Sequence, residues 1–236
     1  MSRALSSADR VKPQSYSSVA AEYYDAERHP TCRNFRDASR SLLRDALCII
    51  PRSGSALEVG AGRALLGELA PKGFDRLILL DKSEEMISYS RGFNQIADLV
   101  VGDALSLPFE GNTFSLIVAS LADPFNGPRF WNEVRRTLKL GAYCVFTTPS
   151  YEWASSFRMR SAYEQQGAAF FQTREGERIY LPSFVEPEAS QRKMIESAGL
   201  HLLQITSIGT AAIPEPHSPK IRGCESVVSG YIVQRT

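Results

Sequence analysis

Several features that mark membrane and secreted proteins are missing from this sequence. No run approaches the roughly 18 consecutive apolar residues of a membrane-spanning helix. Residues 1–15, MSRALSSADRVKPQS, have no apolar core of the kind that a secretory signal needs. We therefore expect a cytoplasmic protein without a membrane partner.

Cysteine is scarce, and the spacing of the cysteines does not indicate a metal site. Cys32, Cys48, Cys144 and Cys224 lie far apart and form no CxxC pair. This pattern argues against a zinc site and against a small disulfide framework. We expect four buried free thiols and no bound metal.

Neither sign of charge is in excess. Lys and Arg number 27 against 26 Asp and Glu, for a net charge of +1. No global field therefore attracts a polyanion, and nucleic-acid binding would need a local basic patch. The one candidate is Arg158, Arg160, Arg174 and Arg178, which a solvated surface explains equally well. A nucleic-acid partner is disfavoured.

The chain is rich in apolar residues, and their pattern indicates strands and helices. At 236 residues and 43% hydrophobic, it is long enough for one substantial core. Between Ser55 and Pro149, strands alternate with helices, which is typical of a doubly wound parallel sheet. We expect strands at 53–59, 76–81, 98–103, 114–120 and 141–149, with 98–103 and 114–120 central, and helices at 33–49, 83–91 and 128–138.

The alternation of strands and helices stops between Ser150 and Pro187, where aromatic and charged residues mix without a crossover pattern. We interpret this segment as an insertion. A helix at 186–199 then precedes two strands, 200–208 and 226–236, that no helix separates. Such a pair predicts an antiparallel hairpin at one end of the sheet.

The sequence LEVGAGRA at residues 57–64 runs from a buried strand into a tight glycine turn. Gly60 and Gly62 let a ligand approach the backbone, at the strand end where open α/β sheets bind ligands. A dinucleotide fingerprint would need a third glycine where Leu65 stands, and it leaves Glu58 unexplained.

Two further acids follow strands. Asp81 lies about twenty residues past the turn, where an acidic side chain accepts hydrogen bonds from ribose hydroxyls; capping of the next helix is better served by Ser83. Asp103 is the second residue of the string GDALSLPF at 102–109. This string and the acid-x-G-x-G turn closely resemble class I S-adenosylmethionine-dependent methyltransferases, in the small-molecule group that includes the ubiquinone and menaquinone methyltransferases. Ala64 departs from the usual last glycine.

The resemblance implies a Rossmann-like, seven-stranded, mostly parallel sheet with helices on both faces and a reversed C-terminal strand. It implies one methyltransferase domain over 1–236, with an N-terminal helical cap at 1–50 and a lid at 150–186 over the acceptor pocket. The cofactor would be S-adenosylmethionine, with S-adenosylhomocysteine as its product. The implied cofactor-binding residues are Tyr16, Tyr23, Arg28, Glu58, Gly60, Ala61, Gly62, Asp81, Lys82, Met86, Asp103, Ala104, Leu105, Ser120 and Leu121.

Some of these residues have a second explanation. Tyr16 and Tyr23 could face the cationic sulfonium or simply pack a helix onto the sheet. Arg28 could pair with the methionine carboxylate or with a surface acid. The aromatic residues of the lid, which suit a flat acceptor or a small core of the lid itself, are Trp153, Phe157, Tyr163, Phe170, Phe171 and Tyr180.

Methyl transfer from a sulfonium mainly needs alignment and exclusion of water, so no catalytic residue is assigned. His29, His201, His217 and Asp123 are the groups that could act as a base. The favoured function is methylation of a small molecule. The alternatives are an RNA, DNA or protein methyltransferase, to which Asp123-Pro124-Phe125 bears a faint similarity, and a non-catalytic cofactor-binding relative.

Overall fold

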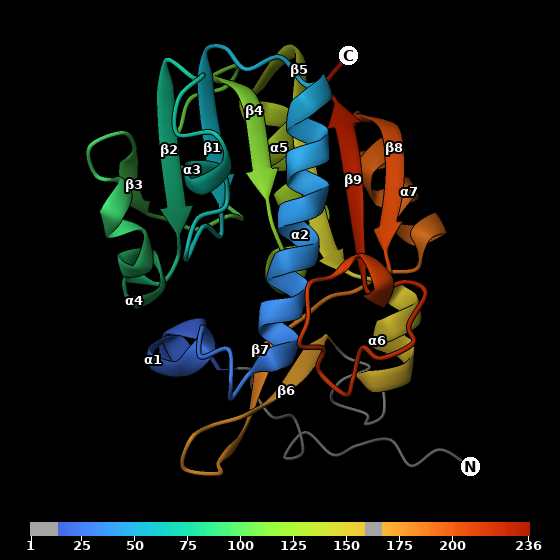
Figure 1. The fold of residues 1–236 in the computed structure, drawn as a ribbon. Coiled ribbons are helices and arrows are strands. Elements are labelled where there is room, and N and C mark those ends of the chain that lie inside the picture. The colour runs from blue at the N-terminus through green and yellow to red at the C-terminus, as the bar shows by residue number, and fades with distance from the viewer. Residues whose placement is uncertain (1–13, 159–166) are drawn as a thin grey trace, which may run out of the picture.

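The computed structural model describes residues 14–158 and 167–236. Its centre is a seven-stranded sheet in the order β3-β2-β1-β4-β5-β9-β8 (Figure 1). All neighbouring strands are parallel except that β9 runs antiparallel to both β5 and β8. The expected mostly parallel sheet with a reversed C-terminal strand is confirmed. The strands are β1 (Ser55–Val59), β2 (Arg76–Asp81), β3 (Asp98–Val101), β4 (Phe114–Ala119), β5 (Leu138–Pro149), β8 (His201–Ile208) and β9 (Val228–Gln234).

Helices cover both faces of the sheet. One face packs against α2 (Pro30–Ile49), α3 (Leu66–Leu69) and α4 (Glu84–Ile87). The other packs against α5 (Pro128–Thr137) and α7 (Glu188–Ser197). Short elements complete the described chain: α1 (Ala20–Tyr23), α6 (Tyr151–Phe157), and 3-10 turns at Tyr16–Val19, Ser88–Phe93, Asp123–Phe125 and Thr210–Ala212.

The strands are apolar because both of their faces are buried. In β2, Leu77 and Leu79 pack toward α2, whereas Ile78 and Leu80 pack toward α5. All four side chains are at most 5% exposed. Strands buried on two faces have near-continuous apolar runs, which is the pattern that the sequence shows.

Three expectations about these elements are wrong. Strand β3 lies at the edge of the sheet, where Val101 is 58% exposed, because a short apolar run does not reveal how many neighbours a strand has. Strand β5 begins at Leu138, directly after α5, rather than at Gly141. The four thiols are all free, but only Cys144 is buried and Cys48 is exposed.

The segments outside the sheet gather at the carboxyl ends of the parallel strands (Figure 1). Strands β6 (Ala168–Gln172) and β7 (Arg178–Pro182) form an antiparallel hairpin. Its apolar face packs on Val19 in a small cluster with Phe171, Ile179 and Leu181. In the described residues, no helix has the length and apolar character needed to cross a membrane.

Candidate active site

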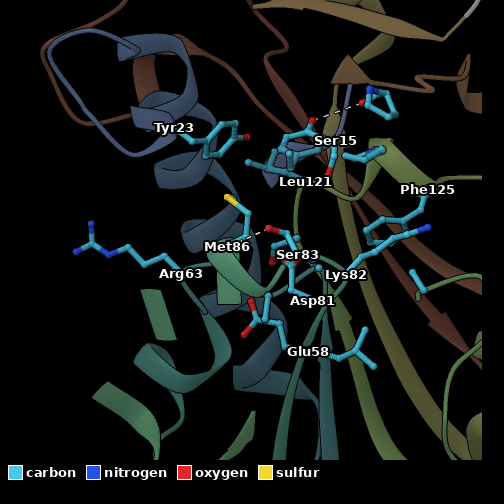
Figure 2. Close-up of a pocket in the computed structure, with 18 of the residues that line it drawn as sticks. Ser15, Tyr23, Glu58, Arg63, Asp81, Lys82, Ser83, Met86, Leu121 and Phe125 are labelled. Carbon is cyan, nitrogen blue, oxygen red and sulfur yellow. Dashed lines mark hydrogen bonds between the residues drawn. The ribbon is translucent and has the colours of Figure 1, made fainter. Parts of the chain in front are cut away.

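A cavity of about 410 Å³ lies at the carboxyl ends of β1, β2 and β3, where open α/β sheets bind ligands. Figure 2 shows labelled lining residues from the ends of β1 and β2, from the segment after β4 and from the N-terminal segment. The three acids singled out in the sequence, Glu58, Asp81 and Asp103, all line it. The topology therefore brings together residues that are far apart along the chain.

The glycine turn is shaped for close approach. Gly60 has a φ of +67°, and a Cβ on it would lie 2.8 Å from a carbon of the Phe125 ring. Gly62 has a φ of +43°, and a Cβ there would collide with the Tyr24 hydroxyl. Both conditions disfavour a side chain. Ala64 is absent from the described residues with positive φ, so its methyl group is accommodated without backbone strain.

Glu58 is a structural acid at the base of the turn. Its two carboxylate oxygens accept hydrogen bonds from the backbone N–H groups of Leu65, at 2.9 Å, and Leu66, at 2.8 Å. These donors belong to the first turn of α3, which has no intrahelical partners for them. The side chain is 1% exposed, and burial raises the pKa of Glu58 to about 7, although the two N–H groups oppose that shift.

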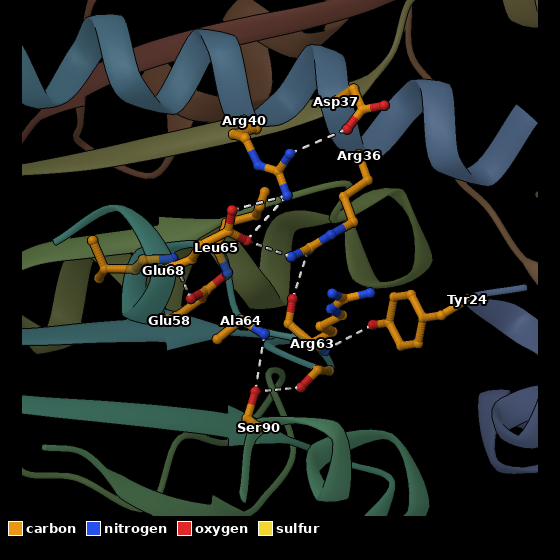
Figure 3. A network of polar contacts seen from close by, with 12 residues as sticks. Tyr24, Arg36, Asp37, Arg40, Glu58, Arg63, Ala64, Leu65, Glu68 and Ser90 are labelled. Carbon is orange, nitrogen blue, oxygen red and sulfur yellow. Dashed lines mark hydrogen bonds and ion pairs between the residues drawn. The ribbon is translucent and has the colours of Figure 1, made fainter. Parts of the chain in front are cut away.

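The rest of the turn is clamped by side chains from distant segments (Figure 3). The Tyr24 hydroxyl accepts from the N–H of Arg63 at 2.8 Å, and Arg36 donates to the carbonyl of Arg63 at 2.6 Å. Ser90 accepts from the N–H of Ala64 and donates to the carbonyl of Gly62. The turn is thus fixed before any ligand binds.

Asp81 lies at the end of β2 beside the turn. One of its oxygens accepts from the N–H of Gly62 and the other from the N–H of Ser83, both at 2.9 Å. Burial raises the pKa of Asp81, against the effect of these donors. Each oxygen keeps a further lone pair for a ligand. Ser83 caps α4 by accepting from the N–H of Met86, as expected.

Asp103 follows β3 and is more exposed. One oxygen accepts from the N–H of Leu105 at 2.9 Å, and the other accepts from the ammonium group of Lys82 at 2.8 Å. The pair spans the ends of β2 and β3. It forms the part of the cavity wall that also contains Ala104 and Leu105.

The opposite wall comes from the segment after β4. Leu121 has a φ of +51°, which is unusual for a residue with a side chain, and its N–H donates to Thr147 Oγ1 at 2.9 Å. The Ser120 Oγ is buried and has no hydrogen-bond partner among the described residues. A strained residue and an unsatisfied polar atom next to each other are typical of a ligand site.

The cavity lining contains most of the residues inferred from the sequence. Those found there are Tyr16, Tyr23, Glu58, Gly60, Ala61, Asp81, Lys82, Met86, Asp103, Ala104, Leu105, Ser120 and Leu121. Gly62 shapes the turn without lining the cavity, and Arg28 lines a different cavity. Sequence reasoning missed Ser15, Tyr24 and Arg36, which long-range packing brings there. It also missed Arg63 and Phe125, which lie within four residues of predicted ones.

Arg28 belongs to a second cavity, of about 630 Å³, between the N-terminal segment and the β6–β7 hairpin. Tyr16, Tyr23 and Cys32 line both cavities and so mark their junction. The two tyrosine rings contact each other edge to face, with centroids 5.6 Å apart. Burial raises the pKa of both phenols well above the ordinary value, so both remain hydrogen-bond donors at neutral pH.

The aromatic residues of the lid divide between this cavity and packing. Trp153, Phe157, Phe170 and Phe171 line the second cavity. Phe171 also belongs to the small cluster under the hairpin, so the two explanations given above for the lid both apply to it. Tyr180 packs on Phe170 across the hairpin instead. Tyr163 lies outside the described residues.

The four groups that could act as a base have different surroundings. His29 lines the second cavity and contacts Glu22 at 3.1 Å. Asp123 is buried against Arg158, at 3.0 Å, and Ser183. His217 contacts a backbone carbonyl, and His201 is exposed on β8. Of these four, His29 is the group that both lines a cavity and contacts a carboxylate that orients it.

The arginines considered as a basic patch do not share a role. Arg158 is enclosed, with its guanidinium 5.1 Å from the centroid of the Trp153 ring and paired with Asp123. Arg174 and Arg178 are exposed, and Arg160 lies outside the described residues. The described residues contain no cluster of three or more His, Cys, Asp or Glu side chains suited to a metal ion.

Comparison with known proteins agrees with this geometry. Residues 57–146 match the family model of a methyltransferase domain. The matched part contains most of β1, all of β2 to β4 and most of β5, which includes the glycine turn and the ends of β2 and β3. Two proteins with this fold were solved with S-adenosylmethionine or its product, namely the DhpI complex with S-adenosylmethionine and geranyl diphosphate C-methyltransferase with S-adenosylhomocysteine. No curated protein sequence matches the chain significantly.

Solved structures share this fold at low sequence identity. An S-adenosylmethionine-dependent methyltransferase from Methanosarcina mazei is 20% identical over 81% of this chain and 96% of its own, with a TM-score of 0.62. A methyltransferase in complex with the Trm112 activator of Haloferax volcanii is 19% identical over 93% and 95%, with a TM-score of 0.68. Geranyl diphosphate C-methyltransferase from Streptomyces coelicolor is 13% identical over 84% and 78%, with a TM-score of 0.61.

Proposed function

We propose that this methyltransferase transfers the methyl group of S-adenosylmethionine to a small molecule, with the cofactor in the first cavity and the acceptor in the second. The observation that carries the proposal is the junction at Tyr16, Tyr23 and Cys32, which belong to both cavities. Two ligands in these cavities would meet there. The reacting atoms would then be enclosed by the N-terminal segment and the hairpin.

The residues of the first cavity fit the cofactor. Gly60 lines the cavity beside the Phe125 ring, and the unpartnered Ser120 Oγ offers a ligand a hydrogen bond. Asp81 would accept from the ribose hydroxyls with its remaining lone pairs, and Asp103 would accept from the adenine amino group. Arg63, rather than Arg28, is then placed to attract the methionine carboxylate, since it lines this cavity.

Methyl transfer from S-adenosylmethionine mainly requires that the protein align the cofactor and the acceptor. Bound S-adenosylmethionine supplies an activated methyl group on a positively charged sulfur. The rings of Tyr16 and Tyr23 give a cation at the junction an aromatic neighbour. Holding two reactants in contact and excluding water from them lowers the barrier without a dedicated nucleophile. The cavity walls contribute that arrangement.

The alternative of a nucleic-acid or protein acceptor has less support. The enclosed Arg158 and its partner Asp123 are not available to a polyanion at the surface. The Streptomyces coelicolor protein with this fold is named for a small-molecule acceptor. Both points favour a low-mass acceptor for the second cavity.

Transfer of a tritiated methyl group from S-adenosylmethionine to the components of a cell extract tests the proposal. We expect label in the fraction of low molecular mass. Ala169→Trp, which fills the second cavity, should reduce transfer at least 10-fold while S-adenosylhomocysteine binds normally. The control Ala211→Trp, at an exposed position, should transfer like the wild type. Label in protein or nucleic acid, or full activity of Ala169→Trp, would contradict it.

A further inference from the structure

We infer that the second cavity selects an acceptor with an anionic group at one end and an aromatic or otherwise apolar body. This inference rests on the proposed function, which makes the cavity the acceptor site. The described residues that line the cavity include no Asp or Glu. They include four basic residues, which are Arg28, Arg158, Arg174 and Lys220.

Three of the cations that line the cavity belong to the solvent-exposed part of its lining, which we call the mouth. Arg28, Arg174 and Lys220 are exposed to solvent although they line it. Arg28 and Lys220 form no ion pair within the part of the chain that the structure describes. Arg174 has only a long contact of 3.8 Å with Asp25. An anion at this mouth would meet charges that the protein itself leaves largely unneutralised.

The nearby acids are already occupied by other partners. Glu22 contacts His29 at 3.1 Å and accepts from the N–H of Arg174 at 3.0 Å. Asp25 accepts from the N–H groups of Glu27 and Arg28, both at 3.1 Å. These hydrogen bonds hold the loop that presents the side chain of Arg28. The acids therefore organise the mouth and do not line the cavity.

Much of the remaining lining is aromatic. The lining includes Phe35, Trp153, Phe157 and Phe171. The guanidinium of Arg158 lies 5.6 Å from the centroid of the Phe35 ring and is neutralised by Asp123. Aromatic walls favour a flat or apolar body over a polar one.

The cavity therefore has two chemically different ends. Its inner end is the junction at Tyr16, Tyr23 and Cys32, where the methyl group would be delivered, and its outer end carries Arg28 and Lys220. A molecule that fits both ends places its anion at the mouth and its methyl-accepting atom at the junction. A carboxylate and a phosphate share the chemistry that the mouth recognises.

Binding of matched probes tests the inference. Calorimetry on the full chain saturated with S-adenosylhomocysteine would compare 2-naphthoate and 2-naphthyl phosphate with neutral 2-naphthamide. We expect at least one anion to bind 10-fold or more tightly than the amide. The double variant Arg28→Gln/Lys220→Gln should reduce this preference below 3-fold. The control Arg44→Gln/Lys72→Gln removes one exposed arginine and one exposed lysine elsewhere and should keep it.

Probe binding tests the acceptor preference, whereas S-adenosylhomocysteine binding tests the proposed function. The ratio between the two anions identifies the preferred headgroup. Equal binding of anions and amide, no binding of any probe, or a preference that survives in the double variant would overturn the inference while S-adenosylhomocysteine binding leaves the cofactor site intact. Failure of the wild type to bind S-adenosylhomocysteine would instead refute the proposed function.

Discussion

The carboxylate of Glu58 gives a pH signature that can be calculated. The group is 1% exposed and its pKa is raised from the ordinary value of 4.5 to about 7, chiefly by burial. A raised pKa in the folded state means that the folded chain binds the extra proton, so stability is highest at low pH and is lost as the pH rises from 4.5 through 7. Between pH 5 and pH 8, this loss is about 2–3 kcal/mol.

Replacement by Gln removes the titration but keeps the shape. Glu58→Gln keeps one oxygen for Leu65 or Leu66 and turns an amide N–H₂ toward the other donor, which costs about 1–3 kcal/mol at pH 8. The free energy of unfolding of the wild type, measured in urea, should fall relative to that of the variant by about 2–3 kcal/mol from pH 5 to pH 8. The exposed control Glu110→Gln should follow the wild type. Parallel curves for wild type and Glu58→Gln would refute the reasoning.

Three further substitutions probe the site. Gly60→Ala places a Cβ 2.8 Å from the Phe125 ring at a φ of +67°, so we expect a loss of about 1–2 kcal/mol in urea unfolding and weaker cofactor binding by calorimetry; unchanged values for both would contradict the geometry. Ser120→Ala removes a buried, unpartnered hydroxyl and should lower cofactor affinity several-fold without lowering thermal stability; a lower melting temperature with unchanged affinity would show a structural role. Arg158→Ala leaves the carboxylate of Asp123 buried and unpaired and should cost about 3–5 kcal/mol of unfolding free energy, whereas a loss below about 1 kcal/mol would show that the ion pair is weak.

Local signals predicted much of the fold. The strand 76–81 and the Ser83 cap follow from an apolar run and an N-cap residue, and the structure has both at those positions. The edge position of β3 was missed because it depends on which strands pair, and a four-residue apolar run carries no such information. Sheet order is a property of the whole chain.

In the site too, features set by local sequence were predicted and features set by long-range packing were not. The acids and glycines at strand ends were found because parallel strands place their carboxyl ends along one edge. The contacts of Tyr24 and Arg36 with the glycine turn were not found, because segments separated by more than twenty residues meet there only after folding. Arg28 was considered as a partner of the methionine carboxylate or of a surface acid, and its side chain lines the second cavity.

Calorimetric titration with S-adenosylhomocysteine tests the central claim most directly, through Asp81→Asn and the matched control Asp98→Asn on the exposed edge strand. The Asp81→Asn substitution would replace one accepting oxygen by an amide nitrogen that cannot accept from Gly62, Ser83 or a ribose hydroxyl. The account predicts micromolar binding by the wild type and the control and at least 10-fold weaker binding by Asp81→Asn. Equal binding by all three folded proteins would contradict the placement of the cofactor on Asp81.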